Sequence, residues 1–179
     1  MANLPQQSKL IGDLIKEKFP NGQWKIDETL QKFYREKDAP KKEMMLEKIA
    51  IKIKNDSEWK YMEPSLTYFQ SDLVSAFEKK NDWNGMQNAI KKYDIKGNAL
   101  AIIYNNAAWD IQKTNKNLDL AEKMSSTAVD IAKNNWKAPT DKRPLYLAES
   151  QWEESRADTY GLYANTYAMV MYKLEKYKK

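Results

Sequence analysis

Apolar residues recur every three or four positions along most of this chain, the spacing that gathers them on one face of an α-helix. The stripe is clearest in segment 64–82, through Leu66, Phe69, Leu73, Ala76 and Phe77. Segment 117–135 has another, through Leu118, Ala121, Met124, Ala128 and Ile131. Shorter stripes predict helices over 8–19 (with Leu10, Leu14 and Ile15), 24–34, 37–55, 83–93 and 98–115. We therefore expect about eight helices and no strand.

Polar residues and prolines mark where these helices begin and end. Asp38 precedes Pro40, which suits an N-cap followed by proline in the first turn. Residues 136–147 contain Pro139 and Pro144, so we expect a non-helical connection there. Ser150 and Glu153 have the spacing of a capping box, which predicts that the last helix opens at this point.

The composition supports an all-α fold built from antiparallel helical hairpins. Glycine and proline are scarce, at 5 and 6 residues, whereas all-β architectures need many turn residues. Hydrophobic residues make up 42% of the chain, enough for a substantial core. No run of apolar residues is long enough to predict a membrane span.

The chain contains neither cysteine nor histidine. This excludes thiol and Ser–His nucleophiles, imidazole or thiolate metal sites and disulfides, and we expect no cofactor. Paired carboxylates remain as candidate acid–base groups, namely Asp110 with Asp119, and Glu153 or Glu154 with Asp158. An α-helical carbohydrate-active enzyme is thus one alternative, but exposed helix-surface charge is the favoured interpretation, and we expect no catalysis.

The net charge of +5 comes almost entirely from lysine, since Arg35, Arg143 and Arg156 are the only arginines. Acidic residues are interspersed with the lysines, which is typical of a solubilising surface. Arginine is the preferred residue for bidentate contacts to bases and phosphates. A basic module that binds anionic polymers is a second alternative, and nucleic acid is not the expected partner.

Three segments of the chain align as an internal repeat: "DLVSAFEKKNDWNGM", "AAWDIQKTNKNLDLA" and "TYAMVMYKLEKYKK". The first two are offset by 35 residues, and the second and third by 59. The alignment places Trp83, Leu118 and Tyr177 at one position in the turn between helices, and Met86 over Ala121.

This pattern resembles the tetratricopeptide repeat, a helix–turn–helix unit of about 34 residues. Small residues such as Ala121 and Ala128 let two helices approach closely, whereas Trp109, Met86 and Glu175 depart from the family pattern. The resemblance implies a right-handed superhelix of degenerate hairpins over 64–179, with an insertion at about 136–149. We expect residues 1–63 to form an N-terminal helical region, in one continuous domain with the hairpins.

A more specific resemblance is carried by "EKFPNGQW…LQKFYREKDAPKKEMML", "NNAAWDI…LDLAEKMSSTAVDIAKNN" and the final "ESQWEESRADTYGLYANTYAMVMYKLEKYKK". The chain is similar to the helical region of bacterial envelope proteins that also carry a thioredoxin-like domain of TlpA or AhpC/TSA type. The resemblance implies an accessory region whose partner is a thioredoxin-like domain, with a periplasmic or envelope location. Those redox domains depend on CxxC, which is absent here, so no catalytic residue carries over.

The C-terminal helix carries an apolar seam made of Tyr160, Tyr163, Tyr167, Val170, Leu174 and Tyr177. The repeat stops before its second helix, so we expect a fragment of a longer protein, or a chain that uses this seam to bind. In either case the seam would face solvent.

The repeat also predicts a binding surface, because the first helices of successive hairpins line the concave side of a solenoid. One helix offers Ile103, Asn106, Asp110 and Lys113, and the other offers Asn165, Met169 and Tyr172. Asparagine amides can hold an extended peptide through its backbone. Trp136, Tyr146 and Trp152 flank the proline-containing connection and are further candidates for partner contacts. We therefore expect a non-catalytic protein–protein interaction or scaffold region that binds a protein or peptide.

Overall fold

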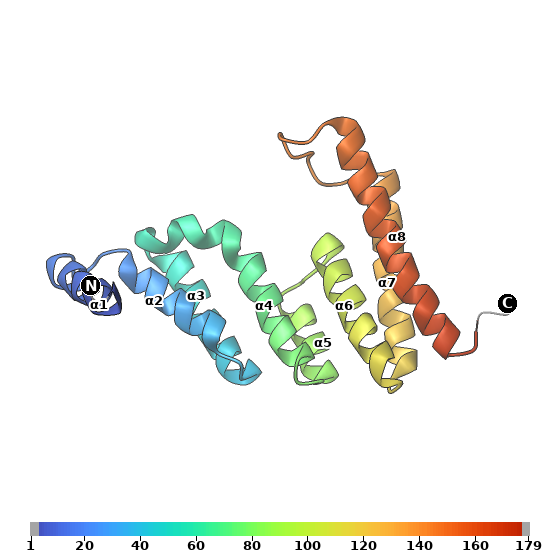
Figure 1. Ribbon diagram of the computed structural model, residues 1–179, viewed down its shortest axis with the longest axis horizontal. Coiled ribbons are helices and arrows are strands. Elements are labelled where there is room, and N and C mark those ends of the chain that lie inside the picture. The colour runs from blue at the N-terminus through green and yellow to red at the C-terminus, as the bar shows by residue number, and fades with distance from the viewer. Residues whose placement is uncertain (1–3, 177–179) are drawn as a thin grey trace. The chain divides into compact units, whose positions relative to one another are not determined.

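The computed structural model describes residues 4–176, and within them all regular structure is helical (Figure 1). The prediction of an all-α chain is confirmed. The α-helices are α1 (Leu4–Lys18), α2 (Trp24–Arg35), α3 (Ala39–Asn55), α4 (Leu66–Glu78), α5 (Trp83–Lys92), α6 (Gly97–Thr114), α7 (Leu118–Lys137) and α8 (Glu149–Lys173). A 3₁₀ helix, η1 (Ser57–Ser65), joins α3 to α4.

The chain divides into two compact units, Met1–Ala76 and Phe77–Lys179, and each is described by itself. The division lies in the last turn of α4. The boundary expected from the sequence, between residues 63 and 64, stays a prediction.

The first unit is packed around large side chains. Phe33, Leu46, Ile49 and Phe69 are all completely buried, and the rings of Phe33 and Phe69 meet edge to face with centroids 5.6 Å apart. The predicted cap of α3 is confirmed, since the Asp38 carboxylate accepts a hydrogen bond from the backbone N–H of Lys41 at 3.1 Å.

A buried lysine also lies in this unit. Lys42 of α3 is 3% exposed, and its ammonium group pairs with the carboxylate of Asp72 on α4. The same ammonium lies 4.9 Å from the ring centroid of Phe33, a cation–π distance. The pairing explains how a lysine is tolerated among apolar side chains, where an unpaired charge would be costly.

The helix η1 is an addition that the apolar pattern did not indicate. Its N-terminus is capped by Asp56, whose carboxylate accepts from the backbone N–H of Glu58 at 3.0 Å. Trp59 is buried at 3% exposure, and the ammonium of Lys52 lies 4.9 Å from its ring. Burial of Trp59 anchors this short segment to the core. The segment is too short for its apolar periodicity to predict a helix.

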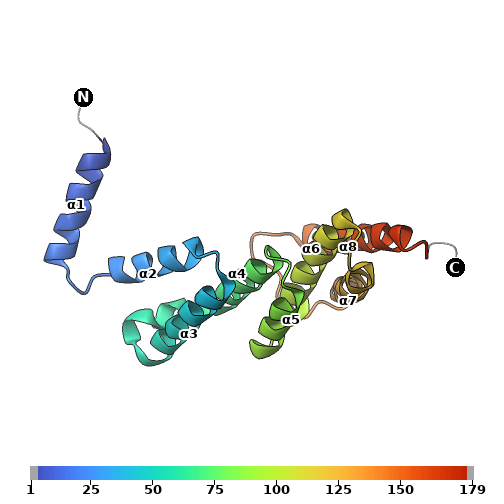
Figure 2. The same ribbon diagram turned by 90° about the horizontal axis from the view of Figure 1, so that it is seen from below.

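In the second unit α6, α7 and α8 lie side by side, with α7 antiparallel to both α6 and α8 (Figures 1 and 2). Each helix contacts the other two. Their shared core is made mainly of alanine, with Ala101, Ala128 and Ala132 packed around Tyr163. Short side chains at the contact allow the helix axes to approach closely, as expected for Ala121 and Ala128, both fully buried.

Short turns precede α5 and α7 in this unit. Asn115 and Asn117 both adopt left-handed backbone conformations, which reverse the chain between α6 and α7. Asp82 caps α5 by accepting from the backbone N–H of Gly85 at 2.9 Å. A Cβ at Gly85 would lie 2.4 Å from the ring of Phe77, so this contact requires glycine.

Two expectations about the last helix are wrong. α8 begins at Glu149, so Ser150 lies inside it, and the carboxamide of Gln151 accepts from the backbone N–H of Ala148 instead. The tyrosine seam is also largely covered: Tyr163 and Val170 are buried, and Tyr160 stacks on Trp136 of α7 at 5.5 Å. The last seam residue, Tyr177, is outside the described residues.

Candidate binding surface

The first half of the predicted surface lies on α6. Asn106, Asp110 and Lys113 are exposed on one face of this helix. The Lys113 ammonium pairs with the Asp110 carboxylate at 2.7 Å and lies 5.4 Å from the ring centroid of Trp109. The Asn106 carboxamide oxygen accepts a long hydrogen bond, 3.5 Å, from the amide of Asn105. This face therefore combines an aromatic ring, an ion pair and an amide.

The second half of the predicted surface lies on α8. Asn165, Met169 and Tyr172 are exposed on one face, and Leu162 extends the same face by one turn at 60% exposure. Neighbouring Lys173 ties the end of α8 to α6, since its ammonium donates to the backbone carbonyl of Gln112 at 2.6 Å and to the Asn115 side chain at 2.7 Å. The two faces therefore belong to neighbouring helices.

Sequence reasoning misplaced one member of the α6 face. Ile103 is buried at 5% exposure and is not available to a ligand, whereas Ile102 is 52% exposed. Ile102, Asn106, Trp109 and Lys113 follow the i, i+4, i+7, i+11 spacing of a single helix face. That spacing was present in the sequence and would have identified Ile102 and Trp109.

We call the exposed faces of α6 and α8 together the α6–α8 surface, comprising Ile102, Asn106, Trp109, Asp110, Lys113, Leu162, Asn165, Met169 and Tyr172. A half-buried acid, Glu78, lies beside it. The pKa of Glu78 is raised from 4.5 to about 7, first by burial and then by the nearby Asp110 carboxylate, whereas Lys79 acts in the opposite direction. Glu78 therefore titrates near neutral pH next to the α6 face.

The paired acids considered from the sequence are all exposed. Asp119 lies 4.0 Å from the Lys176 ammonium, and Asp110 pairs with Lys113. Among the residues the structure describes, no group of three or more acidic side chains could hold a metal ion. None of the helices within 4–176 combines the length and apolarity of a membrane span.

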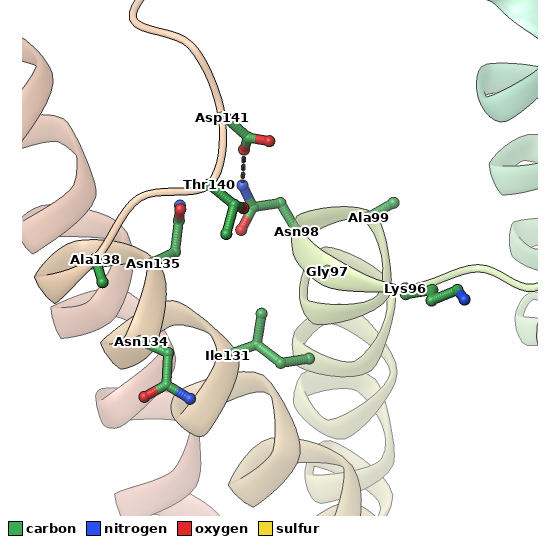
Figure 3. A pocket seen from close by; sticks show the side chains of 10 residues that line it. All are labelled: Lys96, Gly97, Asn98, Ala99, Ile131, Asn134, Asn135, Ala138, Thr140 and Asp141. Atoms are coloured by element: carbon green, nitrogen blue, oxygen red, sulfur yellow. Dashed lines mark hydrogen bonds between the residues drawn. The ribbon is translucent and has the colours of Figure 1, made fainter.

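A pocket of about 560 Å³ lies where the start of α6 meets the end of α7 and the following loop (Figure 3). Asn98 of α6 donates a 2.5 Å hydrogen bond to the Asp141 carboxylate, which ties the loop to the helix. Asn134 and Asn135 line the α7 side. Amides and one acid thus dominate this pocket.

A second pocket, of about 270 Å³, shares Asn98, Asn135 and Asp141 with the first and continues between α6, α7 and α8. We call it the Arg156 pocket. The Arg156 guanidinium lies 3.8 Å from the ring centroid of Trp152. Sequence reasoning noted both residues, but nothing in the local pattern indicated that they line a pocket.

The aromatic residues near the loop have different environments. Trp136 stacks on Tyr160, and Trp152 stacks under Arg156, whereas Tyr146 is 84% exposed. Adjacent Leu145 is almost completely exposed. The loop itself is held by Arg143, which donates to the backbone carbonyl of Leu147 and pairs with Glu149 at 3.2 Å.

In comparisons with known proteins, no family model matches this chain, and neither the curated proteins nor the solved structures include a significant match.

Proposed function

We propose that this chain is a tetratricopeptide-like interaction region that binds a protein or peptide segment along the α6–α8 surface and performs no chemistry of its own. The observation that carries the proposal is the composition of that surface. Large apolar side chains alternate there with amides and charges while remaining exposed. Exposed apolar residues grouped with hydrogen-bonding side chains are characteristic of interaction sites.

The internal repeat supports the proposal. Asn106 and Asn165, Asp110 and Met169, and Lys113 and Tyr172 are each separated by 59 residues, and all six are exposed. Positions 35 residues apart are buried in both copies, for example Leu73 with Ala108, Ala76 with Ile111, Met86 with Ala121, and Ala89 with Met124. The repeat is degenerate, because Val74 is fully buried whereas its counterpart Trp109 is 39% exposed.

The decisive experiment uses peptides selected by the wild-type chain from a displayed library of unstructured sequences. Their affinities are then measured by fluorescence anisotropy with Asn106→Ala/Asn165→Ala and with Trp109→Ala. We expect each variant to bind at least about 10-fold more weakly, because two amide hydrogen bonds or one aromatic anchor are lost. The melting temperature should not fall, since the three side chains are exposed.

The matched control is Asn84→Ala/Asn88→Ala, which removes two exposed asparagines from α5. It should leave affinity unchanged. Equal affinity of the Asn106→Ala/Asn165→Ala variant and the wild type would remove the α6–α8 surface as the site. Affinity that falls steeply with salt and persists in both asparagine variants would instead favour an anionic polymer as the ligand.

The sequence resemblance makes a thioredoxin-like domain from a bacterial envelope the first folded partner to test. The Asn106→Ala/Asn165→Ala and Trp109→Ala variants can be used to test binding of this domain as well.

A further inference from the structure

Arg156 is unusual among the cations of this chain. It is one of three arginines among 30 basic residues. Arg143 is engaged by Leu147 and Glu149, whereas Nε and Nη1 of Arg156 are buried and have no hydrogen-bond partner within the described residues. Buried guanidinium N–H groups without acceptors are costly, so a missing acceptor is the simplest explanation for this geometry.

The surroundings of Arg156 fix the chemistry of that acceptor. The guanidinium is held against Trp152 and lines the Arg156 pocket, where a planar fork can bind a carboxylate with two hydrogen bonds. Asp141 lines the same pocket and contributes a negative charge. Asp141 repels a doubly charged phosphate more strongly than a singly charged carboxylate, whose charge Arg156 balances.

The pocket also offers an acceptor that lacks a donor. The side-chain oxygen of Asn135 is buried without a hydrogen-bond partner. A ligand N–H would satisfy it. Ala101, Ile102, Ala132 and Tyr163 supply the apolar part of the lining. The unmet requirements are therefore one carboxylate, one N–H donor and a small apolar group.

We propose that the Arg156 pocket binds an acylated amino acid with a free carboxylate, in which the carboxylate contacts Arg156, the amide N–H contacts Asn135 and the apolar side chain packs between α6 and α7. This chemistry occurs both in free N-acyl amino acids and at the C-terminus of a peptide. The site goes beyond the proposed interaction function, because it does not include the polar and charged residues of the α6–α8 surface.

The test is isothermal titration calorimetry of the full chain with three probes: N-acetyl-leucine, N-acetyl-leucinamide, and an acetylated Ala-Ala-Leu peptide with a free C-terminus. We expect N-acetyl-leucine and the peptide to bind, and the amide to bind at least about 10-fold more weakly because it has no charge for Arg156. Tighter binding of the peptide than of N-acetyl-leucine would identify a chain end as the source. Equal binding would identify recognition of the terminal residue alone.

Variants assign the binding to the pocket. Arg156→Gln should weaken N-acetyl-leucine at least about 10-fold, and Arg156→Lys should restore only part of the loss because the ammonium lacks the planar fork. Asn135→Ala should weaken binding to a smaller extent. Arg35→Gln, which removes a charge from an exposed arginine of α2, is the matched control and should have no effect. Circular dichroism verifies that each variant is folded. If Arg156→Gln does not fold, Arg156→Lys still tests the role of Arg156.

Three outcomes would overturn the proposal. They are the absence of N-acetyl-leucine and peptide binding to the wild type, equal binding of N-acetyl-leucine and N-acetyl-leucinamide, and unchanged affinity in a folded Arg156 variant. Inorganic phosphate is tested as a competitor of N-acetyl-leucine. Displacement of N-acetyl-leucine by equimolar phosphate would show a general anion site and contradict the proposed selectivity.

Discussion

The two units fill their interiors with side chains of different size. In Met1–Ala76 the core contains Phe33, Phe69 and Leu46, whereas in Phe77–Lys179 one core cluster among α6, α7 and α8 is formed by alanines around Tyr163. Large side chains fill a wide interior, and alanines bring helices close together. The comparison teaches that the two units should be sensitive to opposite kinds of substitution.

Buried charge is also treated differently in the two units. Lys42 is buried with the Asp72 carboxylate as its partner. Glu78 is partly buried, and its nearest strong influence besides burial is another acid, Asp110. The first arrangement compensates the buried charge, and the second favours the neutral form of the acid.

The largest effect is expected from Phe33→Ala. Removing a fully buried ring leaves a cavity and also deletes the contacts with Phe69 and the Lys42 ammonium. We expect a loss of about 3–5 kcal/mol in the free energy of unfolding, measured by urea denaturation. Hydrogen exchange should become faster in α2 and α3. Unchanged exchange there would contradict the assignment of Phe33 to this core.

A smaller effect of the opposite kind is expected from Ala128→Leu. The alanine is completely buried among α6, α7 and α8, so a larger side chain must push the helices apart. We expect a loss of about 1–3 kcal/mol. Exposed Ala168→Leu on α8 is the matched control and should change the free energy of unfolding by less than about 0.5 kcal/mol. If Ala128→Leu stabilised the chain, close packing would not be what the alanines provide.

The smallest effect, and the only stabilising one, is expected from Glu78→Gln. The pKa of Glu78 rises from its ordinary 4.5 to about 7 in the folded chain, so the folded state holds this proton more tightly than the unfolded state. The wild type therefore loses stability as pH rises from about 5 to 7, and the loss persists above that range. Because the side chain is partly exposed, we expect Glu78→Gln to be more stable by about 1 kcal/mol at pH 8.

The Glu78→Gln difference should vanish below about pH 4.5, where the glutamate is protonated in both states. Thermal denaturation of both proteins from pH 4 to 8 measures it. Asp110→Asn is the companion variant and should reduce the pH dependence of the wild type, because it removes the second cause of the raised pKa. A difference that is independent of pH would mean that Glu78 does not titrate in this range.

Most helices could be predicted because their signals are local. The Asp38 cap and the turn after α6 depend on residues only a few positions apart. The start of α8 was missed because two possible capping pairs overlap in the sequence. The Gln151 carboxamide accepts from the backbone N–H of Ala148, whereas Ser150 and Glu153 were the expected pair. The candidate surface was largely identifiable for the same reason, since helix periodicity alone groups Asn106 with Lys113 and Asn165 with Tyr172.

The amino-acid sequence by itself determined that this chain is helical, that it lacks thiol and imidazole chemistry, and which residues share a helix face. Only the tertiary structure decided which of those faces are covered. Leu10, Leu14 and Ile15 form an apolar stripe, yet all three are exposed on α1, whereas the described residues of the α8 seam are buried or half-buried. Periodicity specifies a helix face, but burial of that face depends on elements distant in sequence. The burial of the unsatisfied Arg156 on α8 is another example, because its pocket is also lined by α6, which begins about 50 residues earlier.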